Sequence, residues 1–219
     1  MRRRHFIALV GGAAAMRPLA SAAQQASGKM PRIGLLIRDV ATTRHLQEAL
    51  INGLRDLGYI DGRNILIDYR DAAGQADRYT ELVSELLTLN VDVIVVTNTP
   101  AAFAAKRTTS TVPIVLAWVA DPVGSGLVAG LSRPGGNITG LSFLAPDLVA
   151  KRLELLAEAV PGISRIAVLW HPGDYGDRTE NEMLKAAQVA ATTLGMEFEV
   201  FTADGPEDFE RAFFEIKAR

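Results

Sequence analysis

The segment Val91–Pro100, VDVIVVTNTP, constrains the fold of this chain more than any other stretch. A β-branched run with no charge after Asp92 is typical of a strand buried on both faces, and such strands belong to parallel sheets covered by helices. Thr99 and Pro100 then predict a helix start, with Thr99 as the N-cap and Pro100 at the first helical position. A polar corner between a buried strand and a helix N-terminus presents free backbone N–H groups, which suit a small polar or anionic ligand.

The same alternation of strand and helix repeats along the chain and predicts two consecutive α/β units. Residues 31–144 contain five strand patterns, beginning with Arg32–Ile37, and four intervening helix patterns. They predict a doubly wound parallel sheet of the Rossmann or flavodoxin type. Residues 145–219 begin with a crossover helix and continue with two strands, the first at Arg165–Trp170, and two helices, which predicts an incomplete second unit. Because that unit would have an unpaired sheet edge, we expect at least one further strand after Arg219.

Polar residues ahead of the helix patterns predict where helices begin. Asp77 is expected to cap the helix that follows it. Asp121 and Pro122 form another pair of cap and proline, so we expect them to open a short helix that runs through Leu131. Residues 38–43 are expected to form the corner after the first strand.

The first 25 residues differ in composition from the rest of the chain. Three arginines, Arg2–Arg4, precede an apolar run, Phe6–Met16, and a small-residue segment, Ala20–Ala23. This order is typical of a removable export signal, and the apolar run is too short for a membrane-spanning helix. The segment Arg3–Ile7 resembles a twin-arginine signal, so we expect the mature protein in the periplasm. The alternative is a disordered or helical N-terminus that stays on the chain.

Charge and histidine placement disfavour several classes of protein. Lysine and arginine number 23 against 25 aspartate and glutamate, with no basic cluster beyond the first residues, which disfavours nucleic-acid binding. The three histidines, His5, His45 and His171, are far apart in sequence, and the chain has no cysteine. We therefore expect no metal site, no cysteine nucleophile and no cofactor. A G-x-S-x-G segment is also absent, so we expect no catalytic residues.

The segment Gly124–Ala129 fits the dinucleotide-binding pattern G-x-G-x-x-A. In a nucleotide-binding βαβ unit this pattern follows a strand directly and opens a full helix. Here the preceding loop is too long and the expected helix too short, which disfavours a dinucleotide. Gly135 and Gly136 are interpreted as a tight turn rather than as a phosphate cradle.

Polar side chains at two predicted corners favour a small ligand that carries both charges. Asn98 and Thr99 lie beside the free N–H groups of a helix start, which suits a carboxylate, and Asp121 at the neighbouring corner suits an ammonium group. Together they predict a site for an amino-acid zwitterion. Helix capping alone explains Thr99 and Asp121 equally well, and that alternative stays open.

Two tryptophans, Trp118 and Trp170, fall near strand ends, one in each predicted unit. An aromatic ring from each unit could hold an apolar or aromatic ligand, and packing in the core is the alternative for both. His171, Asp174 and Tyr175 follow the second tryptophan, and Ser142 lies near the end of the fifth strand. Trp118, Ser142, His171 and Tyr175 complete the expected ligand-binding set.

Six motifs invite comparison with known families: Gly53–Tyr59, Val91–Val95, Thr99–Ala102, Asp121–Val128, Arg133–Gly140 and Lys151–Leu156. They resemble the solute-binding proteins of ABC transporters related to the tryptophan/tyrosine-binding type. The resemblance implies the type I periplasmic-binding fold, in which two lobes clamp a small ligand, and it implies ABC permease subunits as partners, with contact to the membrane only through them. The first corner, Arg38–Ala41, departs from the family because it carries an arginine and an aspartate where small polar residues are common.

Two functions of different class remain open. The first is the extracytoplasmic solute-binding component of an ABC importer, binding an amino acid or a related carboxylate. The second is an exported enzyme of flavodoxin-like architecture acting on a small molecule, which turnover of a substrate would reveal. A sugar-responsive regulator of the same fold is disfavoured because no helix-turn-helix precedes the first strand.

We predict that the chain is cleaved on export between about Ala22 and Gln24, within the small-residue segment. N-terminal sequencing of protein recovered from the periplasm should then find no trace of Arg2–Arg4. A mature protein that retains those arginines would contradict the export signal.

Overall fold

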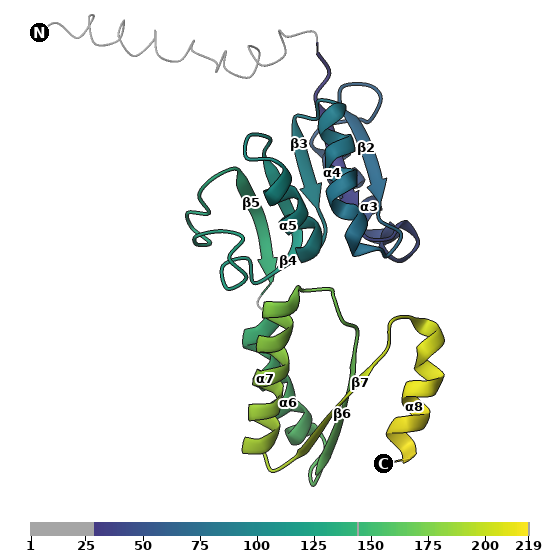
Figure 1. Ribbon diagram of the computed structural model, residues 1–219, viewed down its shortest axis with the longest axis vertical. Coiled ribbons are helices and arrows are strands. Elements are labelled where there is room, and N and C mark those ends of the chain that lie inside the picture. Colours follow the sequence, from purple (N-terminus) through teal and green to yellow (C-terminus); the bar gives the residue numbers. More distant parts are fainter. Residues whose placement is uncertain (1–28, 144, 219) are drawn as a thin grey trace, which may run out of the picture. The chain divides into compact units, whose positions relative to one another are not determined.

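Five parallel strands form the sheet of the first unit in the computed structural model, which describes residues 29–143 and 145–218 (Figure 1). Their order in the sheet is β2-β1-β3-β4-β5, as the doubly wound prediction requires. Sheets with this order bind ligands beyond the carboxyl ends of β1 and β3, where the winding direction switches. The strands are β1 (Arg32–Ile37), β2 (Leu66–Asp71), β3 (Val93–Val96), β4 (Ile114–Ala120) and β5 (Ile138–Phe143).

Helices cover both faces of this sheet, which is why its central strands are apolar throughout. On one face, α4 (Tyr79–Thr88) and α5 (Thr99–Thr108) lie side by side and pack on the sheet. On the other face, Leu50 and Leu54 of α3 (Val40–Asp56) pack against Leu35 and Val95. A short 3₁₀ helix, η1 (Ala76–Arg78), precedes α4.

The second unit is built on a two-stranded parallel sheet. Its core includes Leu153, Ile166 and Ala191, where two helices pack on the strands. Both predicted strands are present, and the first has the expected bounds. The elements are α6 (Ala145–Ala159), β6 (Arg165–Trp170), α7 (Asp177–Thr193), β7 (Glu197–Thr202), η2 (Pro206–Asp208) and α8 (Phe209–Ala218).

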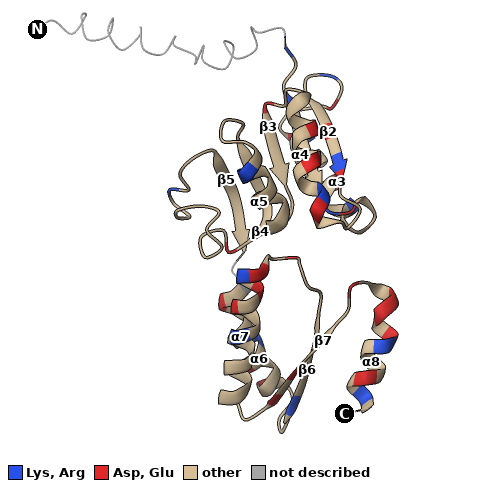
Figure 2. Cartoon of the chain, in the orientation of Figure 1, with Lys and Arg blue, Asp and Glu red and all other residues tan. Residues whose placement is uncertain are grey.

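Acidic and basic residues are interspersed along the described helices (Figure 2). Several form pairs one helical turn apart, such as Arg178 with Glu182 in α7. None of these helices is long and apolar enough to cross a membrane. The expected export signal lies outside the described residues.

The cap of α5 is Asn98 rather than Thr99, which corrects the prediction by one residue. Asn98 has an extended backbone with φ −153°, and its Oδ1 accepts a hydrogen bond from the N–H of Ala101 at 2.8 Å. Asparagine caps helices at least as well as threonine, so the earlier of two adjacent candidates starts the helix. Thr99 is therefore the first helical residue, and its hydroxyl is not used for capping.

The expected helix from Pro122 through Leu131 is absent, and turns occupy that segment. Asp121 adopts a left-handed backbone with φ 37°, and its Oδ1 accepts a hydrogen bond from Gly124 N–H at 2.8 Å. Asn98 makes the same kind of contact as the cap of α5, but its backbone is extended, whereas the left-handed backbone of Asp121 closes a turn that no helix follows. The first unit thus has three α-helices between its described strands rather than four, and Gly124–Ala129 lacks the helix that a dinucleotide site needs.

Two further helix starts also differ from the prediction. Helix α3 begins at Val40, because Asp39 caps it by accepting a hydrogen bond from Thr42 N–H at 3.0 Å, so the corner is shorter than residues 38–43. Asp77 lies inside η1, and α4 begins without a side-chain cap. In the second case the 3₁₀ turn leads directly into the helix, which makes a separate cap unnecessary.

We predict that Gly140→Ala destabilises the protein by roughly 2–6 kcal/mol, because it adds backbone strain to steric overlap. Gly140 has φ 138°, and a Cβ there would overlap the backbone nitrogen and carbonyl oxygen of Leu116 in β4. Gly136→Ala is the matched control, since Gly136 has φ 64° but faces open space, and it should cost only about 1–2 kcal/mol. Equal losses in urea denaturation would contradict the close approach of β4 and β5.

Candidate functional site

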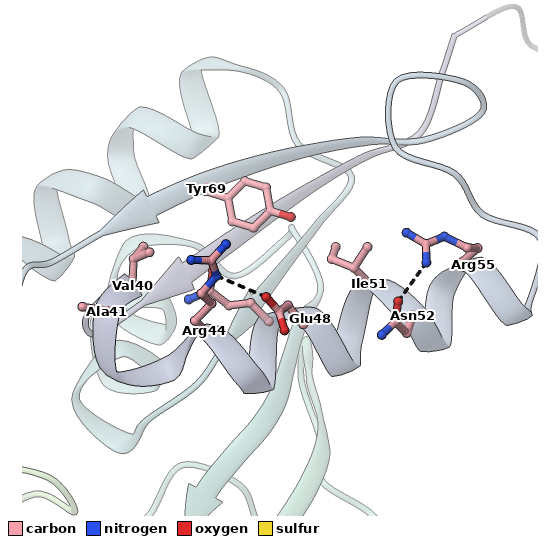
Figure 3. Close-up of a pocket in the computed structure, with 9 residues that line it drawn as sticks. Val40, Ala41, Arg44, Glu48, Ile51, Asn52, Arg55 and Tyr69 are labelled. Carbon is pink, nitrogen blue, oxygen red and sulfur yellow. Dashed lines mark hydrogen bonds and ion pairs between the residues drawn. The ribbon is translucent and has the colours of Figure 1, made fainter.

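A groove of about 760 Å³ runs along the exposed side of α3 next to Tyr69 of β2 (Figure 3). Its charged and polar residues already bind one another: Arg44 pairs with Glu48 at 3.1 Å, and Arg55 donates to Asn52 at 2.9 Å. None of the residues predicted for the site lines this groove. We therefore place the candidate site elsewhere, at the carboxyl ends of the strands.

The corners that follow β1 and β6 meet through a charged contact. Arg38, directly after β1, donates one hydrogen bond to the carboxylate of Asp174 and another to Nε2 of His171 at 2.8 Å. Both side chains of the ion pair are about 30% exposed, so the pair is partly shielded from water. The contact joins positions 136 residues apart in sequence and links the two units at their strand ends.

Two adjoining cavities lie at these corners. The smaller, of about 80 Å³, is lined by Arg38, Tyr79, Asn98, His171 and Asp174, among others. The larger, of about 470 Å³, lies beside the starts of α5 and α7 and has Phe103, Ser125, Tyr175 and Thr179 in its wall. Both cavities have Ala76, Pro100 and Gly173 in their walls, so they are direct neighbours.

Three buried hydroxyl oxygens in this region have no hydrogen-bond partner: those of Thr99, Ser125 and Thr179. Thr99 is 1% exposed and Thr179 is fully buried. Thr99 opens α5, Thr179 lies in the first turn of α7, and a Cβ on Gly176 would lie 3.7 Å from the methyl carbon of Thr99. Unpartnered buried hydroxyls are costly, and helix N-termini favour anions, so the arrangement suits a polar ligand.

Four aromatic rings form a row of contacts that reaches from the first unit to the second, beside the cavities. The ring centroids of Trp118 and Phe143 are 5.0 Å apart, those of Phe143 and Tyr175 are 5.8 Å apart, and those of Tyr175 and Trp170 are 6.3 Å apart. Trp118 is 56% exposed, so core packing does not account for it. Trp170 and Tyr175 pack around buried Met183, which makes them part of a small apolar cluster.

Two tyrosines in the region are held in the neutral form. Burial raises the pKa of Tyr79, whose hydroxyl accepts a hydrogen bond from Asn98 Nδ2 at 2.6 Å. Burial also raises the pKa of Tyr175, and the nearby Asp174 carboxylate adds to that rise. Both phenols are neutral at neutral pH, as an ordinary tyrosine is, and the upward shifts carry that state to higher pH.

The structure brings only some of the predicted residues to the cavities. Asn98, His171 and Tyr175 line them. The other four do not line them. Thr99 is buried at the start of α5, Trp118 is exposed on β4, the carboxylate of Asp121 closes its own loop, and Ser142 is exposed on β5.

The expected ligand-binding set lacks Arg38, Ser125, Phe143 and Thr179, and it leaves out Asp174, which follows Trp170 in the sequence. Arg38, Phe143 and Thr179 lie at or directly after the end of a strand or in the first turn of a helix, and that position is the signal that could have identified them. Among the described residues, no group of three or more histidine, aspartate and glutamate side chains could hold a metal ion.

Comparison with known proteins assigns this architecture to a family. The family model for ABC transporter substrate binding protein matches residues 41–218. A tyrosine-binding protein of Clostridioides difficile (strain R20291) is 34% identical over 139 residues, which are 63% of this chain and 39% of that protein.

Solved structures show the same fold. A conserved domain protein from Vibrio cholerae is 31% identical, with a TM-score of 0.74 over 86% of this chain and 62% of that one. An ABC domain from Streptococcus pneumonia, solved in complex with L-Trp, is 23% identical, with a TM-score of 0.73 over 87% and 63%. This chain spans less than two thirds of the length of these relatives. The match across most of its length shows that the chain belongs to the ABC transporter substrate-binding protein family.

Proposed function

We propose that the protein is the extracytoplasmic binding component of an ABC importer and holds a small amino acid or related carboxylate between its two units. The observation that carries this proposal is the set of unpartnered hydroxyls of Thr99, Ser125 and Thr179, which come from both units. Ser125 and Thr179 line the larger cavity, and Thr99 directly precedes Pro100 of its wall. A ligand with polar groups would supply the missing hydrogen bonds.

The proposed ligand contacts combine polar groups and aromatic surface. Thr99 and Thr179 offer hydroxyls at the starts of α5 and α7, which suit polar groups of the ligand. Tyr175 offers a ring face and a neutral hydroxyl. Of the sequence-based set, Asn98, Thr99, Trp118, His171 and Tyr175 stay part of the proposal, whereas Asp121 and Ser142 do not line the cavities.

Family membership and the N-terminal sequence support export and delivery to a permease. Substrate-binding proteins of ABC importers act outside the cytoplasm, and the first 25 residues have the composition of an export signal. The relative named for tyrosine supports an amino acid as the ligand. We propose a periplasmic protein that approaches the membrane through its permease and carries out no chemical step.

A thermal-shift panel of amino acids and small carboxylates on the full-length protein tests this proposal. A ligand at a hundred times its dissociation constant should add about 2.7 kcal/mol to the free energy of unfolding. Chromatography of each stabilising compound after long incubation should recover it unchanged. Conversion into a product would favour the enzyme alternative, and a panel without any stabilising compound would oppose the binding function.

We predict that Thr99→Val separates folding from binding. Removing a buried hydroxyl without a partner should raise the free energy of unfolding by about 1 kcal/mol. Losing its hydrogen bond to the ligand should weaken binding roughly 2- to 12-fold in calorimetry.

Thr108→Val, at the other end of α5, is the matched control. The Thr108 hydroxyl already donates to the carbonyl of Ala104 at 2.8 Å, so this change should leave the affinity unaltered. Unchanged affinity in Thr99→Val would remove Thr99 from the site.

A further inference from the structure

The ion pair between Arg38 and Asp174 joins the two units, and neither residue belongs to the set predicted from sequence. We propose that this pair sets the charge specificity of the site: a ligand separates it, giving its carboxylate to Arg38 and its ammonium group to Asp174. The inference rests on the proposed function and narrows its ligand class to zwitterions, with simple acids and simple amines excluded.

The position of the pair allows this exchange. Arg38 and Asp174 both line the smaller cavity, together with His171. Each is about 30% exposed, so a ligand can reach the pair, yet water screens it only in part. An arginine has five N–H donors in a planar fork that fits a carboxylate in two-point contact, and here Asp174 occupies part of that fork.

The selectivity comes from the unpaired charge that a ligand with a single charge would leave in the site. A simple carboxylate that takes Arg38 from Asp174 leaves the aspartate partly buried without a countercharge, and a simple amine does the same to Arg38. A zwitterion gives a countercharge to both Arg38 and Asp174, so each side chain exchanges its old partner for a group of the ligand. The net charge of the region stays the same before and after binding.

Neighbouring groups support the assignment of each charge. Arg38 donates to His171 Nε2 at 2.8 Å, which fixes the guanidinium while its partner is exchanged. Asp121, the ammonium partner expected from sequence, already accepts a hydrogen bond from Gly124. Asp174 directly precedes Tyr175, whose ring contacts Phe143, so the body of the ligand has aromatic surface beside its charged end.

Calorimetry with a matched set of ligands tests the proposal on the full-length protein. The probes are tyrosine, its deaminated analogue 3-(4-hydroxyphenyl)propionate and its decarboxylated analogue tyramine, followed by the equivalent analogues of the amino acid that binds best in the panel. The wild-type protein should bind the amino acid at least roughly 10-fold more tightly than either analogue, because one charge-assisted contact contributes that factor or more.

Two variants should change this preference in opposite directions. Asp174→Asn should weaken amino-acid binding roughly 10- to 100-fold and strengthen binding of the deaminated acid, because Arg38 is then free to accept it. Arg38→Gln should weaken both of those ligands and favour the amine. Arg44→Gln, which breaks an exposed ion pair on α3, is the control and should change nothing.

Each outcome decides the matter. An unchanged ranking of the three ligands in Asp174→Asn, with a normal melting curve, would show that the pair only links the two units. If a variant fails to fold, the affinities of the wild-type protein for the three ligands still test the proposal. Equal affinity for the amino acid and its deaminated analogue would overturn it. If the zwitterion proposal is overturned but a carboxylate still binds tightly, the proposed binding function stands. If no compound in the thermal-shift panel binds, both the proposed function and the zwitterion proposal are overturned.

Discussion

Burial of β1 and β3 on both faces is the constraint on which the rest of the structure depends. Leu36 and Ile37 of β1 and Ile94 and Val96 of β3 are fully buried. Strands of this kind need helices on both faces, and the helical crossovers make the strands parallel. Every carboxyl end then lies at the same edge of the sheet, so the polar residues that follow the strands gather there. The candidate site is a consequence of how the core is built.

Strand positions were predictable because their signal is local. The strands Arg32–Ile37 and Arg165–Trp170 have the expected bounds, since a run of β-branched and aliphatic residues needs no information from the rest of the chain. Helix starts were less predictable. Asn98 and Thr99 are both competent caps, and backbone geometry decided between them. Asp121 followed by Pro122 fits a helix cap and a closed turn equally well, and Asp121 has the left-handed backbone of a turn rather than the extended backbone of the caps of α3 and α5.

The site itself was only half accessible from sequence. Residues next to strand ends could be identified as candidates, and Asn98, His171 and Tyr175 do line the cavities. The pairing of Arg38 with Asp174 could not be identified from sequence, because the two residues are 136 positions apart and meet only when both units have folded. Buried hydroxyls without partners are also invisible to sequence patterns, since satisfaction of a hydrogen bond is a property of the packed structure.

The central claim is that both units contact one ligand through the starts of α5 and α7. Hydrogen exchange followed by mass spectrometry, with and without a ligand that raises the melting temperature, tests this claim most directly. The account predicts slower exchange at residues 98–103 and at residues 173–180 together, because one molecule covers both helix starts. Protection confined to one of these segments, or found instead along the groove on α3, would contradict it.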